Sequence, residues 1–90
     1  MNIIRQRLIY TGQVQGVGFR YRAKHVALKL GVTGWVHNEW DGRVTMEAQG
    51  TIDQINELMK LINQSPLIYI DWVDRINIPL EEGERGFHTR

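Results

Sequence analysis

The 90-residue sequence has no cysteine, only two prolines and no long uninterrupted run of apolar residues. The lack of cysteine excludes disulfides, a thiolate nucleophile and thiolate-based zinc sites. Because there is no long apolar run, we expect the sequence to contain no signal peptide and no membrane-spanning helix. A domain without disulfides must be held by packing, which suits a reducing compartment, so we expect a cytoplasmic protein.

Charge is almost balanced over the whole chain but unevenly distributed along it. The net charge is +1, with 42% hydrophobic and 23% charged residues, which is typical of one small globular domain spanning residues 1–90. Residues 1–38 carry six basic side chains and no acid, whereas all ten acids lie in residues 39–90. If the basic half shares one surface, it favours a small anion; alternatively, the two halves intermix and cancel.

Hydrophobic periodicity predicts four long strands and two helices. The predicted strands are residues 3–14, 33–39, 43–49 and 68–78, and Asp41-Gly42 is a typical hairpin turn between the middle two. A glycine-rich stretch, with Gly12, Gly16 and Gly18, leads into a helix that ends at Gly31. A second helix runs between a Thr51-x-x-Gln54 capping box and Ser65-Pro66. We expect Phe87 to tie a short terminal segment back to the sheet.

Each predicted element has one apolar face. The buried stripe of the first helix is predicted to be Phe19, Ala23, Val26, Ala27 and Leu30. That of the second is predicted to be Ile52, Ile55, Leu58, Met59 and Ile62. In the last strand the residues expected to share a face are Ile68, Ile70, Trp72, Ile76 and Ile78.

The element order β-α-β-β-α-β predicts an α+β fold, the ferredoxin-like βαββαβ sandwich, with an antiparallel sheet and two helices on one face. In this plan the third strand lies between the first and second, and the fourth lies outside the first. The C-terminal ends of the first two strands then lie on one edge, about 10 Å apart at two strand spacings. The glycine-rich loop and Asn38 should therefore meet at one rim.

The segment Gln13-Val14-Gln15-Gly16-Val17-Gly18-Phe19-Arg20 predicts a phosphate-binding loop. Glycines allow main-chain N–H groups to turn inward, and a helix N-terminus adds unpaired donors. Arg20 can add a bidentate contact. The segment lacks the Gly-Lys-Ser/Thr of a Walker loop, and Tyr21 occupies the last glycine position of a dinucleotide fingerprint. A tight turn beside a solvated arginine is the alternative interpretation.

Two motifs together resemble the acylphosphatase family. The first is Gly12-Gln13-Val14-Gln15-Gly16-Val17-Gly18-Phe19-Arg20. The second is Gly34-Trp35-Val36-His37-Asn38, followed by Asp41-Gly42-Arg43-Val44 and later by Gly50. Their order and separation match the family, and the resemblance covers essentially the whole chain.

The resemblance implies that Arg20 and Asn38 are catalytic, with Arg20 binding the phosphoryl group and Asn38 orienting the attacking water. It also implies that main-chain amides form the phosphate cradle, from Gln15, Gly16, Val17, Gly18, Phe19 and Arg20. The chain departs from the family pattern at His37, where relatives often have Arg or Lys, at Trp40, and at Ser65-Pro66 in place of Gly-Pro.

The implied reaction is hydrolysis of the carboxyl–phosphate bond of a small acyl phosphate by direct attack of water. The leaving carboxylate has a conjugate-acid pKa of about 4 to 5, so it needs no proton from the enzyme and no metal. We therefore expect no cofactor and no metal site, and inorganic phosphate should be both product and competitive inhibitor. His25, His37 and His88 form no close-spaced metal motif. We expect a monomer.

Two other functions compete with this hypothesis. A domain of the same fold could bind phosphate or acyl phosphate without turnover. A ferredoxin-like domain could instead bind RNA, but residues 43–48 contain no aromatic side chain for stacking and include Glu47. We therefore expect no nucleic-acid partner, and we expect Trp35, Trp40 and Trp72 to pack in the core or at its rim.

Overall fold

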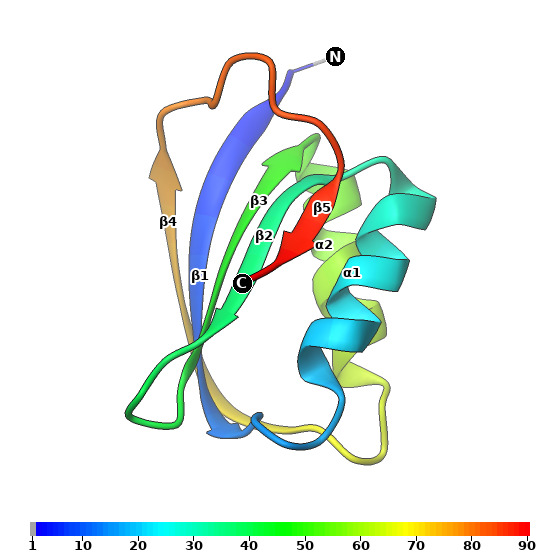
Figure 1. Ribbon diagram of the computed structural model, residues 1–90. Coiled ribbons are helices and arrows are strands. Elements are labelled where there is room, and N and C mark those ends of the chain that lie inside the picture. Colours follow the sequence, from blue (N-terminus) through cyan, green and yellow to red (C-terminus); the bar gives the residue numbers. More distant parts are fainter. Residues whose placement is uncertain (1) are drawn as a thin grey trace.

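A computed structural model describes residues 2–90, and its strands and helices follow the predicted order with one short strand added. The elements are β1 (Ile4–Gln13), α1 (Phe19–Leu30), β2 (Thr33–Asn38), β3 (Val44–Gly50), α2 (Ile52–Asn63), β4 (Tyr69–Ile78) and β5 (Phe87–Thr89). Both helices lie against the same face of the sheet (Figure 1). The ferredoxin-like fold class is therefore confirmed.

The sheet has the order β4-β1-β3-β2-β5, so the predicted placement of the first four strands is confirmed. Neighbouring pairs among these four strands are antiparallel. The terminal segment joins as predicted through Phe87, but β5 runs parallel to β2, which makes the sheet mixed at that edge. The hairpin between β2 and β3 and the loop between β1 and α1 both lie at the lower end of the molecule in Figure 1.

The core lies between the helices and the sheet. Its fully buried side chains include Leu8 and Tyr10 from β1, and the residues Val36, Val44, Met46, Ala48, Ile55, Leu58 and Ile62. In α1 the predicted stripe is buried at Phe19, Ala23 and Ala27 and partly buried at Val26 and Leu30. Ile52 departs from the predicted stripe of α2: it is 42% exposed, because it is the first residue of the helix.

A β-bulge in β4 reverses the faces of the strand that its second half presents, so the prediction that Ile70, Trp72 and Ile76 share one face is wrong. Thr11 pairs with Trp72 whereas Gly12 pairs with Ile70, so Asp71 is an extra residue on β4. Because side chains alternate along a strand, one extra residue moves every later side chain to the other face. Val73 consequently packs against the core, whereas Trp72 is 64% exposed and Ile76 is 54% exposed.

Gly12 is the residue that makes room for this bulge. Its φ is +141°, and a Cβ at this position would overlap the main chain of Tyr69 and Asp71. The first glycine of the glycine-rich stretch is therefore explained by packing between β1 and β4.

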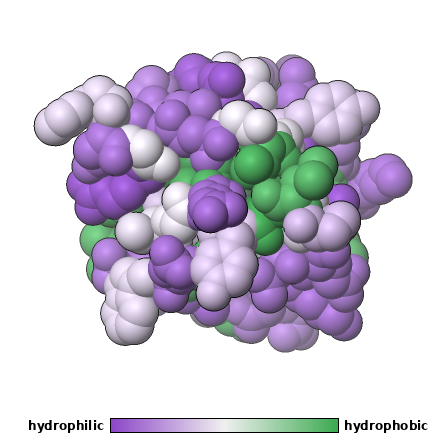
Figure 2. All heavy atoms as spheres, turned by 90° about the horizontal axis from the view of Figure 1, so that it is seen from below, coloured by the Kyte–Doolittle hydropathy of each residue, from purple (hydrophilic) through white to green (hydrophobic). Residues whose placement is uncertain are grey.

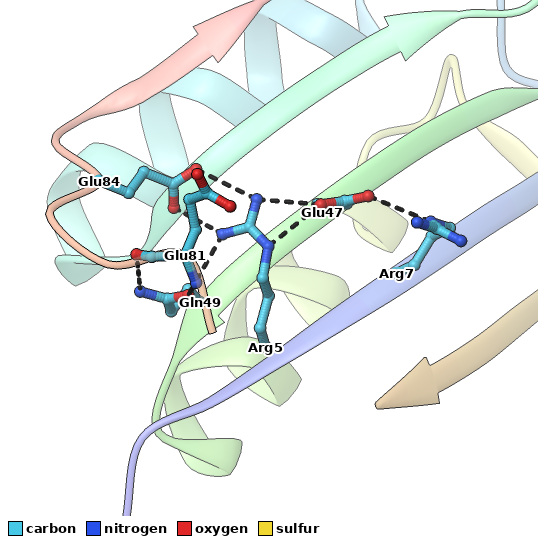
Figure 3. Close-up of polar contacts among 6 residues, drawn as sticks. All are labelled: Arg5, Arg7, Glu47, Gln49, Glu81 and Glu84. Atoms are coloured by element: carbon cyan, nitrogen blue, oxygen red, sulfur yellow. Dashed lines mark hydrogen bonds and ion pairs between the residues drawn. The ribbon is translucent and has the colours of Figure 1, made fainter. Parts of the chain in front are cut away.

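The face of the sheet that the helices leave uncovered carries a buried arginine, Arg5. Its guanidinium makes a bidentate contact with Glu84, at 2.8 and 3.1 Å, and a further ion pair with Glu47 at 3.0 Å (Figure 3). Glu47 also pairs with Arg7 at 3.1 Å. The contact with Glu84 fastens the loop of residues 81–86 over β1 and β3, so it shields Arg5, which is 3% exposed.

These contacts shift the pKa of Glu84. Burial alone would raise the pKa of its carboxyl, but hydrogen bonds from Arg5 and Thr33 together with the positive charge of Arg5 hold it below the ordinary value. A carboxylate with a lower pKa in the folded than in the unfolded state stabilises the fold above its unfolded pKa. That contribution is lost as the pH falls through the folded pKa.

We predict that Glu84→Gln lowers the free energy of unfolding at pH 7 by about 2 kcal/mol, because Arg5 stays buried and keeps only Glu47 as an ionic partner. Urea unfolding checks this value, with Glu82→Gln as the matched control in the same loop. The difference from the unmodified protein should shrink as the medium is acidified below the ordinary glutamate pKa. An equal loss in both variants, or a loss independent of pH, would contradict this account.

Candidate active site

A five-residue loop connects the end of β1 to the start of α1 and is anchored at both sides. Val14 begins the loop and Phe19 begins the helix, and both side chains are buried. The Phe19 ring meets the ring of Tyr10 edge to face, with centroids 4.8 Å apart. Between these anchors Gly16 and Gly18 have φ values of +72° and +81°, which favour glycine.

Within residues 2–90, no side chain caps the free amides at the N-terminus of α1. Its N-cap is Gly18, which makes no side-chain capping bond, and its first turn contains no acidic residue. In α2, by contrast, Thr51 and Gln54 form the predicted capping box and Asp53 lies in the first turn. The first N–H groups of a helix carry partial positive charge and need acceptors. The start of α1 is therefore the helix end suited to an external anion.

The structure brings Arg20 and Asn38 together at the predicted rim. They line one pocket of about 190 Å³, together with Val14, Gly16, Gly18, Phe19 and Tyr21. This volume is smaller than that of pockets for drug-sized ligands and suits a small anion. Seen from below, this end of the molecule shows a group of hydrophobic residues surrounded by hydrophilic ones (Figure 2).

Asn38 points toward the helices from the last position of β2. Its cross-strand partner is Val44, which is buried under the helices, and directly paired residues lie on the same face. The side-chain oxygen Oδ1 of Asn38 is buried and accepts no hydrogen bond from any residue within 2–90. A buried amide oxygen needs a donor, so this atom can hold a water molecule in the pocket.

His37 lies on the opposite face of β2. It pairs with Thr45 across the strands, and its side chain is 45% exposed. Its Nε2 atom lies 3.9 Å from a carboxylate oxygen of Glu39. His37 therefore lies outside the pocket that holds Asn38.

Arg20 stands in the first turn of α1 with a free positive charge. Its Nη1 donates to the main-chain carbonyl oxygen of Arg90 at 3.1 Å. Across the part of the chain that the structure describes, no aspartate or glutamate side chain forms an ion pair with Arg20. Most of its guanidinium donors thus remain available to a phosphate oxygen.

The side chain of Gln15 makes contacts that the sequence did not predict. Only the main-chain amide of Gln15 was expected to matter, yet its Nε2 donates to the carbonyl oxygens of Glu39 at 2.6 Å and Arg43 at 3.0 Å. No local pattern announces these bonds, because their partners lie 24 and 28 residues away. Tyr21 was likewise absent from the predicted site, although it lines the pocket.

The tryptophans only partly follow the sequence prediction. Trp35 is partly buried, and the Arg90 guanidinium lies over its ring, 4.4 Å from the centroid. Trp40 is 97% exposed, so its predicted packing in the core or rim is wrong; the residue is at the tip of the β2–β3 hairpin, where no element covers it. In residues 2–90 we find no group of three side chains placed to hold a metal, and no helix long and apolar enough to cross a membrane.

The chain is similar to known proteins both in sequence and in structure. The sequence model of the acylphosphatase family matches residues 6–89. An acylphosphatase of Trichormus variabilis is 38% identical over 88 residues, which are 98% of this chain and 87% of that protein. The crystal structure of acylphosphatase from Bacillus subtilis has a TM-score of 0.88 and 32% identity, and the match covers 99% of both chains.

A larger protein contains the same fold as one part. The crystal structure of full-length HypF in the phosphate- and nucleotide-bound form matches with a TM-score of 0.87 and 26% identity. The match covers 99% of this chain but 12% of that one. The family match over nearly the whole length, the relative that is 38% identical over 88 residues and the common fold lead to one conclusion: this chain belongs to the acylphosphatase family.

Proposed function

We propose that the protein hydrolyses the carboxyl–phosphate bond of small acyl phosphates, giving a carboxylate and inorganic phosphate. Its place in the acylphosphatase family supports an enzymatic function. The observation that carries the mechanism is the single pocket in which Arg20 and Asn38 meet the uncapped start of α1.

The phosphoryl group is bound by main-chain amides and by Arg20. The amides of residues 15–20 surround the phosphate oxygens, since the glycines permit the turn and α1 contributes its partial positive charge. The Arg20 guanidinium offers two parallel N–H donors to two phosphate oxygens. Together these groups stabilise the negative charge that the phosphoryl oxygens carry in the transition state.

The attacking water is held by Asn38. Its unpartnered Oδ1 accepts a hydrogen bond from water, which leaves an oxygen lone pair directed at phosphorus. As the new P–O bond forms, the bond to the carboxylate oxygen breaks and the carboxylate departs with its electron pair. The water proton passes to a phosphate oxygen, so no general base is required. Departure of a carboxylate needs no general acid.

Three further properties are part of the proposal. Inorganic phosphate competes with substrate, since product and substrate present the same group to the same donors. The protein acts as a monomer, since one chain contains the glycine loop, Arg20 and Asn38 that the proposed mechanism uses. It acts in the cytoplasm, which is in keeping with a fold stabilised without cysteine.

The first test compares two phosphate donors. The purified protein should release phosphate from benzoyl phosphate and leave phenyl phosphate intact, because a phenolate departs much less readily than a carboxylate. Binding of phosphate without turnover of benzoyl phosphate would instead identify a binding module.

Inorganic phosphate should perturb the amides of the glycine loop. We predict that titration with phosphate shifts the ¹H–¹⁵N signals of residues 15–20, because these amides form the proposed cradle and Gly18 leaves the start of α1 without a side-chain cap. The signals of residues 52–54 are the internal control, since Thr51 and Gln54 already cap α2. Larger shifts at the start of α2 than in the loop would place the anion site elsewhere.

Arg20→Lys should lower kcat/KM for benzoyl phosphate by about 100-fold, although the charge is kept, because an ammonium cannot make the two parallel hydrogen bonds of a guanidinium. Steady-state kinetics measure this change. Arg85→Lys is the matched control, as Arg85 is an exposed arginine of the 81–86 loop that does not line the pocket. Equal activity of Arg20→Lys and the control would reject the role of Arg20.

Asn38→Ala should lower kcat by about 100-fold and change KM little, since the interaction with the attacking water matters mainly in the transition state. His37→Gln is the matched control on the other face of β2 and should keep most of its activity. If Asn38→Ala raised KM and left kcat unchanged, Asn38 would hold substrate and not water. Stoichiometric phosphate on acid-quenched protein, lost in His37→Gln, would replace direct water attack by a phosphohistidine intermediate.

A further inference from the structure

The side chain of Gln15 joins two segments that are separate in the sequence and together in the proposed site. Gln15 belongs to the loop of residues 14–18 between β1 and α1. Its two acceptors belong to the β2–β3 turn, which begins directly after Asn38. Both N–H bonds of its amide are used, one to Glu39 and one to Arg43. The Gln15 amide thus bridges the first and last residues of the turn, Glu39 and Arg43.

The same two carbonyl groups also close the hairpin itself. The amide of Glu39 donates to the carbonyl oxygen of Arg43 at 2.8 Å, and the amide of Gly42 donates to that of Glu39 at 3.2 Å. The β2–β3 pairing ends at Asn38 and Val44, so residues 39–43 extend beyond the sheet. Gln15 therefore ties the start of this overhanging turn to the phosphate loop.

We propose that Gln15 is a positioning residue, which acts through its side-chain amide to hold Asn38 at a fixed place relative to the phosphate cradle. This inference rests on the proposed function, because it assigns Asn38 the attacking water. Displacing a reacting group by about 1 Å can cost about 100-fold in rate. Phosphate bound to the cradle and water bound to Asn38 lie on different segments, so in-line attack requires that the two segments keep one geometry.

A purely structural role for Gln15 makes different predictions. Loss of a structural hydrogen bond would lower stability and affect phosphate binding and turnover together. Loss of positioning affects the step that needs both segments, which is attack on phosphorus, and spares phosphate binding to the loop. Effects on kcat, on the dissociation constant of inorganic phosphate and on an Asn38 variant therefore separate the two roles.

The central experiment uses Gln15→Met, which keeps the length of the side chain and removes both donors. We expect kcat for benzoyl phosphate to fall by about 10- to 100-fold and the dissociation constant of inorganic phosphate to change by less than about threefold. Gln64→Met is the matched control and should retain its activity, since Gln64 at the C-terminal end of α2 is exposed, does not line the pocket and makes no side-chain hydrogen bond to another residue within 2–90.

A double-mutant cycle tests whether Gln15 acts through Asn38. In the Asn38→Ala background, Gln15→Met should lower kcat by less than about twofold, because the group that it positions is already gone. Independent, multiplicative losses would overturn the proposal, and so would an unchanged kcat in the single variant.

A measurement independent of turnover keeps the result interpretable. Hydrogen exchange at the amides of Glu39 and Gly42 should be faster in Gln15→Met than in Gln64→Met, because the hairpin loses its hydrogen bonds to the Gln15 side chain. If the unmodified protein had no turnover, the proposed function would be wrong, but the exchange rates would still test whether Gln15 holds the hairpin in place. Unchanged exchange at both amides would overturn the proposal that Gln15 positions this segment.

Gln15→Glu is a second variant in case Gln15→Met does not fold. Its ionised carboxylate faces two carbonyl oxygens without a proton to donate, whereas the protonated acid regains one donor. Its kcat relative to the unmodified protein should therefore rise as the pH falls through the pKa of that carboxyl. A constant ratio over this range would contradict a positioning bond.

Discussion

The burial of Val14 and Phe19 is the constraint on which the site depends. Both residues are in the core, and they stand on either side of a turn only four residues long. Fixing the two ends of so short a segment leaves its main chain few conformations, and the two left-handed glycines make one of them accessible. The start of α1 is thereby aimed at the end of the sheet where β2 terminates. An anion site made of main-chain groups gains its precision from apolar packing beneath it.

Most of the fold was predictable from the sequence because short local patterns specify the individual helices, strands and turns. The capping box at Thr51, the turn at Asp41-Gly42 and the apolar stripes each specify a local structure, and the predicted element order and strand order are confirmed. The bulge at Asp71 was missed because nothing in β4 itself marks it; it requires Gly12 on the neighbouring strand. Burial of Arg5 could not be predicted for the same kind of reason, since its partner Glu84 lies 79 residues away.

The candidate site shows the same division between local and distant information. The meeting of Arg20 and Asn38 followed from strand order, and the structure places both in one pocket. Family membership is confirmed, whereas the individual roles of the two residues stay predictions. The two bonds of the Gln15 side chain could not be predicted, because a glutamine has many possible partners and only the folded geometry selects the carbonyls of Glu39 and Arg43.

The bulge at Asp71 also affects how readily another copy of the chain could add a strand to the border of the sheet. An exposed outer strand offers a row of main-chain donors and acceptors to which another chain can add, and this is how sheets grow into aggregates. β4 lies at one border of the sheet, and the bulge breaks the regular repeat of that row. The opposite border is β5, which has only three residues. The bulge that Gly12 permits and the shortness of β5 therefore both limit the regular row of main-chain groups that the two borders of the sheet present.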